Sequence, residues 1–189
     1  MSQGHRLIAF IDSPRGPTLY AEPLRTDRLD VVPLRAEHAP EMAEVLADPA
    51  LHTFIGGSPA TPQALRTRYE HLVAGSPDPT VTWCNWVLRL REHHPQDSRL
   101  IGTVQATITP GAAEAEIAWV IGSPWQGHGY AAEAAHELVT WLTTRQPPIR
   151  TIMAHIHPDH HASAAVARAA GLHPTDEHHD GELRWRLTR

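Results

Sequence analysis

One short loop in the second half of the chain has the composition of an anion-binding site. The segment Gln126-Gly-His-Gly-Tyr-Ala131 follows an apolar run and precedes a long stretch, residues 130–144, without glycine or proline. Gly127 and Gly129 allow successive backbone N–H groups to turn toward one point, beside the positive end of the expected helix dipole. Such a nest binds phosphate without lysine. The loop therefore predicts a pyrophosphate site, although the same glycines also suit a plain strand-to-helix turn.

Two acidic side chains precede this loop on one predicted strand. Glu114 and Glu116 lie two residues apart in the stretch 114–121, so both face the same side of the strand. A carboxylate beside a reaction centre can take a proton from a substrate as general base. A solvated surface position is nevertheless the more common fate of a glutamate, and both interpretations stay open at this stage.

The histidines do not form a recognisable metal site. His155 and His157 alternate on one predicted strand, and four more stand close in sequence: His160, His161, His178 and His179. Imidazoles at alternate positions can converge on a metal ion. No spacing here fixes three or four ligands, however, and the chain carries 15 histidines scattered along its length. We therefore expect no metal.

The single cysteine and the charges exclude several function classes. Cys84 alone cannot form an internal disulfide or a Cys-x-x-Cys site, and nothing near it in sequence favours an acyl-cysteine route. All 16 basic residues are arginine, which removes lysine-dependent chemistry. A formal net charge of −5 argues against nucleic acid or an anionic membrane as partner. The apolar run 7–11 is too short for a signal segment, so we expect a cytoplasmic protein.

The elements that must position these residues follow an order typical of an α+β protein. We expect helices at 36–48, 62–73, 130–144 and 160–170, and a loop at 51–62. We expect strands at 29–34, 83–90, 100–109, 114–121, 150–157, 172–175 and 183–188. Three strands in quick succession predict an antiparallel meander, and hence a mixed, mostly antiparallel sheet flanked by helices. Residues 1–23, broken by prolines, are interpreted as an N-terminal extension, and residues 24–189 as a single domain.

Four segments match motifs of one known family, in the correct order along the chain. The loop 126–131 is similar to a Q/R-x-x-G-x-G/A signature, and the stretch 115–121 resembles the strand before it. The segment 160–172 resembles N-x-A-S-x-x-V-x-x-x-x-G-F, and Leu24-Arg-Thr-Asp-Arg-Leu29 resembles an L-x-T-x-R-L opening. Together they resemble the RimJ/RimL-like branch of the GNAT superfamily of N-acetyltransferases.

The resemblance implies how coenzyme A would bind. The sheet would splay between its fourth and fifth strands, 114–121 and 150–157, to admit the thioester, whose carbonyl a backbone N–H near Val120 or Ile121 would polarise. The pantetheine arm would pair with Trp119, Val120 and Ile121. The pyrophosphate would lie on the backbone N–H groups of Gln126, Gly127, His128, Gly129, Tyr130 and Ala131.

Other site residues follow from the same resemblance. His160 stands where the family has an asparagine that contacts the pantetheine arm, and it can still donate one hydrogen bond. Ser163 matches the family's serine, which binds CoA or protonates the leaving thiolate. Glu116 matches a frequent glutamate and is the first choice as general base. Glu177 matches loosely a carboxylate proposed as base in this branch.

The acceptor side is less well marked in the sequence. Trp83 and Asn85 share one face of a strand near its start, where a tryptophan can wall an acceptor pocket or simply fill the core. Together with Glu114 they are the candidate acceptor-binding residues.

The resemblance predicts an acetyl-CoA-dependent N-acetyltransferase that acts by direct attack in a ternary complex. The acceptor would be a primary amine: a protein N-terminus, an amino acid or a small amine such as an amine antibiotic. A catalytically silent acyl-CoA-binding regulatory module is the alternative, and a protein that binds another anion is a remote one. Both a monomer and a homodimer stay open.

Overall fold

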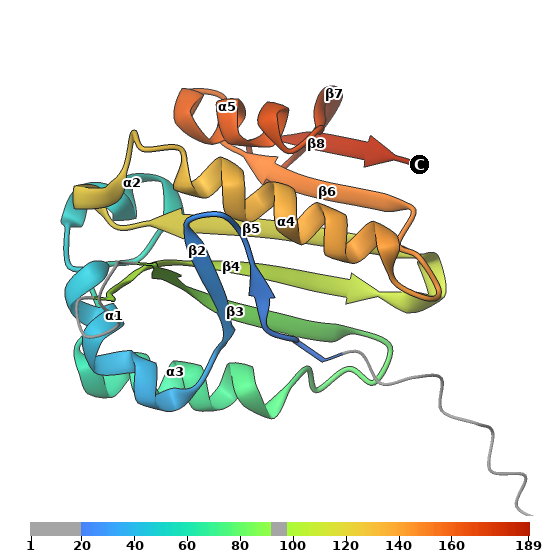
Figure 1. Cartoon of the computed structure of the whole chain (residues 1–189). Helices are drawn as coiled ribbons and strands as arrows, with labels where there is room; N and C mark the ends of the chain where they lie inside the picture. Colours follow the sequence, from blue (N-terminus) through green and yellow to red (C-terminus); the bar gives the residue numbers. More distant parts are fainter. Residues whose placement is uncertain (1–19, 92–97) are drawn as a thin grey trace, which may run out of the picture.

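The computed structural model describes residues 20–91 and 98–189, which form a mixed sheet with helices on both faces (Figure 1). The strands are β1 (Leu24–Arg25), β2 (Leu29–Pro33), β3 (Thr82–Leu90), β4 (Leu100–Thr109), β5 (Glu114–Ile121), β6 (Thr151–Ile156), β7 (His173–His179) and β8 (Glu182–Thr188). The helices are α1 (Ala39–Val45), α2 (His52–Ile55), α3 (Pro62–Ala74), α4 (Tyr130–Thr144) and α5 (His161–Ala169). The predicted α+β class is confirmed.

Most of the predicted N-terminal extension, residues 1–19, lies outside the described residues. Residues 20–23 are described, and among them the Glu22 carbonyl accepts a hydrogen bond from Trp86 Nε1 at 2.7 Å. The division at residue 23 stays a prediction.

The sheet has the order β1-β2-β3-β4-β5-β6-β8-β7, and its neighbours are antiparallel except for β5 and β6. The parallel pair is short, with partners Glu114–Thr151, Ala115–Ile152 and Glu116–Met153. Beyond Glu116 the two strands diverge, and their last residues are not paired with each other. This is the splay expected between the fourth and fifth predicted strands, and it is confirmed.

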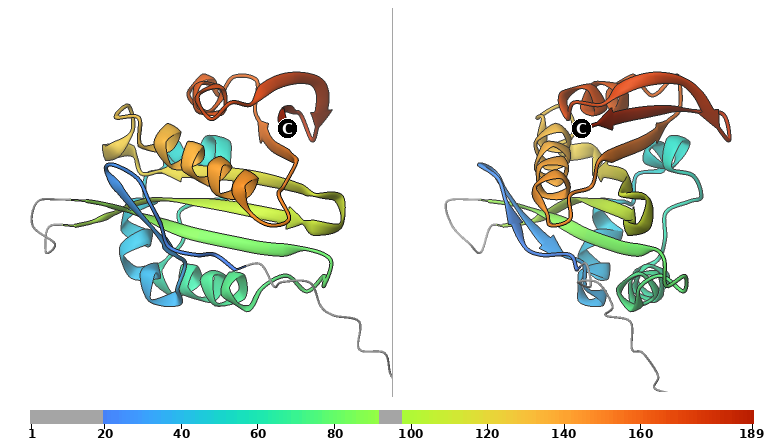
Figure 2. Two further views of the ribbon diagram at one scale, coloured as in Figure 1. Left: turned by 45° about the vertical axis from the view of Figure 1, so that its right-hand side comes forward. Right: turned by 90° about the vertical axis from the view of Figure 1, so that its right-hand side faces the viewer.

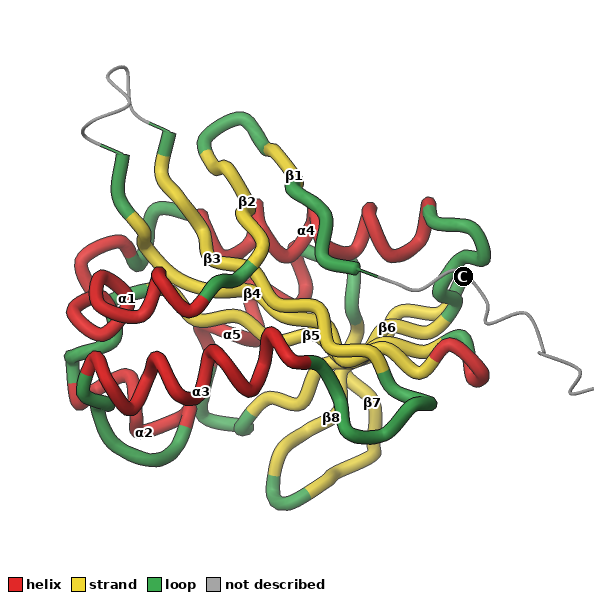
Figure 3. The backbone as a smooth tube through the Cα atoms, turned by 90° about the horizontal axis from the view of Figure 1, so that it is seen from below, coloured by secondary structure: helices red, strands yellow, loops and turns green. Residues whose placement is uncertain are grey.

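Helices α1 and α3 cover one face of the sheet and α4 covers the other (Figures 2 and 3). The alternation along the strands explains both layers, since successive side chains point to opposite faces. Ile117 of β5 is buried in one core together with Leu138 of α4. Val87 of β3 is buried in a second core with Met42 of α1 and Leu65 of α3. The sheet therefore lies between two hydrophobic cores, one packed against α4 and the other against α1 and α3.

Local signals explain where several helices begin. Thr61 Oγ1 accepts a hydrogen bond from the Ala64 N–H at 3.2 Å, and Pro62 occupies the first helical position of α3, as its sequence predicts. The Asp48 side chain accepts from the Ala50 N–H at 2.9 Å and starts a 3₁₀ turn, Pro49–Leu51, that continues into α2.

The structure corrects several sequence-based boundaries. The predicted loop 51–62 is wrong at its start, where α2 forms one helical turn. The predicted helix 36–48 is shorter, because a 3₁₀ turn, Ala36–His38, precedes α1. The strand expected at 172–175 extends to His179 as β7, paired with β8, and the two-residue β1 was not expected.

Candidate active site

The loop between β5 and α4 has the backbone geometry of an anion site. Gly127 and Gly129 have φ angles of +76° and +81°, a left-handed conformation that glycine adopts without strain. A Cβ added to Gly127 would meet no atom within 4 Å, so this side of the loop is open. Gln126 Nε2 donates to the Ile121 carbonyl at 2.9 Å and closes the loop onto the strand end. Because α4 has no side-chain cap, the N–H groups of its first turn are available to a ligand.

A groove of about 680 Å³ runs from this loop along the end of β5 to α5. Its lining includes most of the predicted cofactor residues: Trp119, Val120, Ile121, Gln126, Gly127, Gly129, Tyr130, Ala131, His160 and Ser163. His128 is outside the lining, and its ring stacks on Tyr130 with centroids 5.7 Å apart. An open nest of N–H groups that continues into an elongated groove fits the pyrophosphate and extended arm of CoA. We call this cavity the donor groove.

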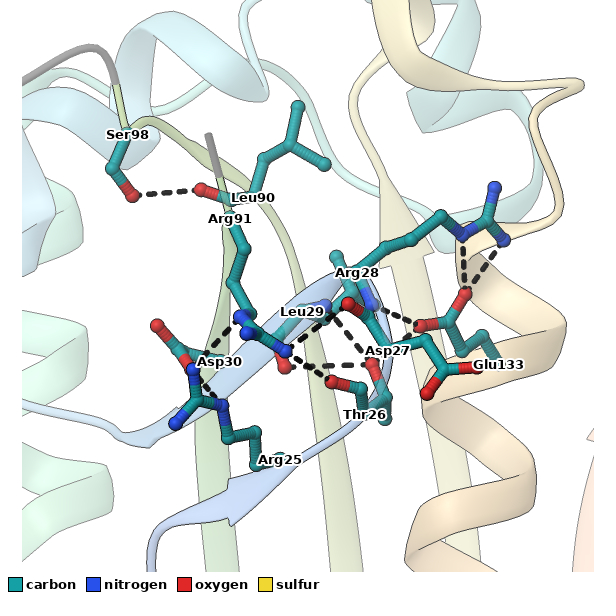
Figure 4. Close-up of polar contacts among 10 residues, drawn as sticks. All are labelled: Arg25, Thr26, Asp27, Arg28, Leu29, Asp30, Leu90, Arg91, Ser98 and Glu133. Carbon is teal, nitrogen blue, oxygen red and sulfur yellow. Dashed lines mark hydrogen bonds and ion pairs between the residues drawn. The ribbon is translucent and has the colours of Figure 1, made fainter. Parts of the chain in front are cut away.

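Contacts from the turn between β1 and β2 hold the loop from outside (Figure 4). Glu133, in the first turn of α4, accepts hydrogen bonds from Thr26 Oγ1 at 2.5 Å, Arg28 N at 2.9 Å and Arg28 Nε at 2.7 Å. The same guanidinium donates to the His128 carbonyl at 2.9 Å and lies 4.7 Å over the Tyr130 ring. Burial alone would raise the pKa of Glu133, but the hydrogen bonds from Thr26 and Arg28 outweigh it and hold this pKa below its ordinary value. Thr26 and Arg28 therefore position the loop.

A second cavity, of about 440 Å³, lies on the face of the sheet that α1 and α3 cover. Its sheet wall carries Asn85, Gln105, Glu116 and His155, and α3 contributes Arg68 and Tyr69. It shares six lining residues with the donor groove: Phe54, Ile55, Trp119, Val120, His160 and Ser163. The two cavities thus meet at the divergence of β5 and β6. We call the second one the acceptor cavity.

The structure separates the two glutamates of β5. Glu116 lines the acceptor cavity, and its Oε1 lies 2.8 Å from Nδ1 of His155. The Glu116 side chain is 49% exposed, so it can meet a substrate. Glu114 lies at the start of β5, where the strand is paired on both sides, and it lines neither cavity. Of the two glutamates, only Glu116 lines a cavity.

The remaining predicted residues divide in the same way. Asn85 lines the acceptor cavity, whereas Trp83 lies outside both linings and contacts His71 with ring centroids 5.5 Å apart. Glu177 lies on β7 outside both linings, where its carboxylate is bound by Arg184. The structure therefore brings Asn85 and Glu116 together and leaves Trp83 and Glu177 away from the cavities.

Several residues that line the cavities were not assigned to the site from the sequence, among them Phe54, Ile55 and His155. Phe54 and Ile55 of α2 line both cavities and are 38% and 44% exposed. Phe54 stacks on His160 with centroids 4.1 Å apart; burial, and secondarily His157, lower the pKa of His160. His155, weighed from the sequence only as a metal ligand, contacts Glu116 instead. The sequence signal for α2 is the pair Asp48-Pro49, a typical helical start that precedes α2 by one 3₁₀ turn.

The described residues contain no cluster of three or more histidine, cysteine or acidic side chains able to hold a metal ion. None of the helices in the described part of the chain is long and apolar enough to cross a membrane. Cys84 is fully buried, and burial raises the pKa of its thiol to about 12. A thiol of this kind is a poor nucleophile.

Comparisons with known proteins agree with this geometry. A sequence model of the acetyltransferase (GNAT) domain matches residues 28–173. A search of curated proteins found no significant match.

Solved structures share the fold over most of the chain. An acetyltransferase from Agrobacterium tumefaciens is similar at a TM-score of 0.69 and 25% identity, covering 94% of this chain and 100% of its own. A Salmonella typhimurium acetyltransferase that modifies the N-terminal serine of a 50S ribosomal subunit protein has a TM-score of 0.69 and 15% identity, with coverages of 87% and 96%. The microcin self-immunity acetyltransferase MccE, solved with acetyl-CoA and AMP, has a TM-score of 0.69 and 13% identity, with coverages of 87% and 94%. At these identities the last two likenesses concern the fold alone.

Proposed function

The chain belongs to the GNAT family of acetyltransferases, enzymes that use acetyl-CoA, and on that premise we propose that it acetylates a primary amine by direct transfer in a ternary complex. One observation carries this proposal: two cavities on opposite faces of the sheet meet at the splay of β5 and β6. A donor in one cavity and an acceptor in the other can therefore react without an acyl-enzyme.

The donor groove would hold acetyl-CoA through backbone groups. The N–H groups of the loop 126–131 bind the pyrophosphate, aided by the dipole of α4. Beyond Glu116, β5 has no partner on its β6 side, so the peptide groups that point to that side, apart from the Ile121 carbonyl that Gln126 binds, could pair with the pantetheine arm. An N–H near Val120 or Ile121 would stabilise the negative charge that develops on the thioester oxygen.

The acceptor cavity would supply the proton transfers. Glu116 accepts a proton from the ammonium form of the acceptor, which leaves a neutral amine. The amine nitrogen bonds to the acetyl carbon, the carbon–sulfur bond breaks, and the nitrogen gives its second proton to water as the amide forms; Glu116 releases its own proton to water after the product leaves. Ser163 would donate its hydroxyl proton to the departing thiolate and regain one from water, a role supported by its position in the lining of both cavities.

The side chains that line the acceptor cavity also support certain classes of acceptor. Asn85 and Gln105 are register partners on β3 and β4 and both line the cavity, so two carboxamides stand side by side to bind polar groups of the acceptor. This supports a protein N-terminus, an amino acid or a small polar amine as the acceptor. The relatives that modify an N-terminal serine or confer microcin immunity support the same classes.

The test is a thiol-release screen of the purified full chain with acetyl-CoA across N-terminal peptides, amino acids and small amines. We expect amine-dependent thiol release, with hydrolysis in the absence of acceptor as the baseline. A parallel titration with CoA measures donor binding by itself. Tight CoA binding without turnover of any amine would favour the silent acyl-CoA-binding module instead.

A further inference from the structure

Four charged or polar side chains connect the acceptor cavity to the C-terminal hairpin. Glu116 Oε1 lies 2.8 Å from His155 Nδ1. On the other side of the ring, Arg184 Nε donates to His155 Nε2 at 3.4 Å. Arg184 is bound in turn by the carboxylate of Glu177 on β7. His155 and Arg184 are register partners on β6 and β8, so the sheet itself sets this contact.

The contacts fix the position of the imidazole proton. An arginine side chain only donates hydrogen bonds, so Nε2 of His155 must accept and carries no proton. The ring proton is therefore on Nδ1, which donates to Glu116. A second proton on the ring would place two N–H groups against each other at the Arg184 contact. The contacts thus select the Nδ1–H tautomer of the ring.

This geometry separates the roles of Glu116, His155 and Glu177. The only lone pair of the neutral His155 ring faces Arg184, and the side chain is 11% exposed, so the imidazole is unsuited to take a proton from an acceptor. Glu177 is occupied by Arg184 and lies outside the cavity. Glu116 receives one neutral N–H, which orients it without neutralising its charge, and its second oxygen is left for the substrate.

We propose that His155 is a positioning residue that holds Glu116 for proton abstraction, and that Arg184, anchored by Glu177, fixes His155 in its Nδ1–H tautomer. This inference rests on the role proposed for Glu116.

Nuclear magnetic resonance of isotope-labelled histidine tests the tautomer without turnover. The His155 signals are identified by their loss in His155→Asn. At neutral pH we expect a protonated Nδ1 and an unprotonated Nε2 in the wild type, and a mixture of tautomers in Arg184→Met. Arg186→Met is the matched control, since Arg186 lies on the same strand and, among the described residues, its ion pair is with Glu177, at 3.8 Å. A predominant Nε2–H tautomer or an imidazolium in the wild type would overturn the proposal.

Steady-state kinetics test the positioning role. His155→Leu removes the donor to Glu116 and should lower kcat by about 10-fold or more, with an unchanged KM for acetyl-CoA. His155→Asn keeps an N–H near the place of Nδ1 and should recover much of that loss. Equal kcat values in the wild type and His155→Leu, or no recovery in His155→Asn, would overturn the role. Unchanged turnover in Glu116→Gln would instead show that the base was wrongly assigned, an outcome that the tautomer measurement distinguishes.

Discussion

The donor groove and the acceptor cavity differ in the groups that form them, which are backbone groups at the anion site and side chains in the acceptor cavity. The anion-binding end of the donor groove is formed by backbone groups of one contiguous loop, 126–131, which the β1–β2 turn holds through Glu133, and α2, α5 and the end of β5 line the rest of the groove. The acceptor cavity is formed by side chains from many separate parts of the chain, among them α2, α3, β3, β4, β5 and β6. Backbone sites tolerate side-chain changes as long as the conformation is kept, whereas a side-chain site depends on single residues. The predictions below use this difference, from the largest expected effect to the smallest.

Glu116→Gln should affect the acceptor side alone. If Glu116 accepts the ammonium proton, the change lowers kcat by roughly 10²–10⁴-fold while the Kd for CoA is retained. The loss should shrink at higher pH, where more of the acceptor is already neutral. Glu114→Gln removes the same charge from the same strand face outside the cavity and should leave turnover close to that of the wild type. A large loss of CoA affinity in Glu116→Gln would mark this residue as structural.

Gly127→Val should affect the donor side alone. The new side chain occupies the open side of the loop and strains a backbone with φ of +76°, so the Kd for CoA should rise by on the order of 10²-fold. Gly181→Val is the control, because Gly181 has φ of +84° and equally open surroundings in the β7–β8 turn. The two variants should lose similar stability, measured by urea unfolding. Equal CoA affinity in both would show that the loop is not the pyrophosphate site.

Arg28→Met tests whether the loop needs its support from the β1–β2 turn. The variant keeps most of the side-chain length but loses the bonds to Glu133 and to the His128 carbonyl. We expect CoA affinity to fall by about 10-fold, because the loop is then less well preorganised. Isothermal titration of Arg28→Met, Glu133→Gln and the double variant measures the coupling. Additive losses would mean that the two residues act independently.

The same contacts predict how stability depends on pH. The folded state holds the pKa of Glu133 below its ordinary value of 4.5, so the ionised carboxylate contributes stability above that value. This contribution is lost as the pH falls through the lowered pKa. The difference in unfolding free energy between the wild type and Glu133→Gln should be constant near neutral pH and shrink in acid. A difference that does not change with pH would show that the charge of Glu133 is unimportant.

Cys84→Ala should have the smallest effect on activity. The thiol is fully buried and lines neither cavity, and direct transfer needs no acyl-enzyme, so kcat should stay within about two-fold of the wild type. Mass spectrometry of the protein incubated with acetyl-CoA should show no acetyl group on Cys84. An acetyl-cysteine that is consumed when the acceptor is added would contradict direct transfer.

The donor side could be predicted from the sequence because its signals are local. The signals are contiguous along the chain: a strand, the glycines at 127 and 129, and a helix. Each of them indicates a backbone conformation by itself. The support by Thr26 and Arg28 could not be predicted in this way, since Glu133 lies 107 residues from Thr26 along the chain. In the sequence, Thr26 and Arg28 belong only to the motif at 24–29, which by itself indicates no contact with Glu133.

The acceptor side could be predicted only in part. Strand periodicity placed Glu114 and Glu116 on one face, but it could not show that the strands diverge only after Glu116. His155 has a partner on β8 that depends on the antiparallel register, which no local pattern reveals. α2 was missed because it is one turn long and the glycines and proline after it dominate the segment.

The wall that the two cavities share also has a thermodynamic consequence. Phe54 and Ile55 of α2 line both the donor groove and the acceptor cavity, so a ligand that displaces either side chain changes the shape of both. Binding of one substrate that displaces these side chains then raises or lowers the affinity for the other, and this effect is reciprocal. The factor by which acetyl-CoA changes the affinity for the acceptor equals the factor by which the acceptor changes the affinity for acetyl-CoA.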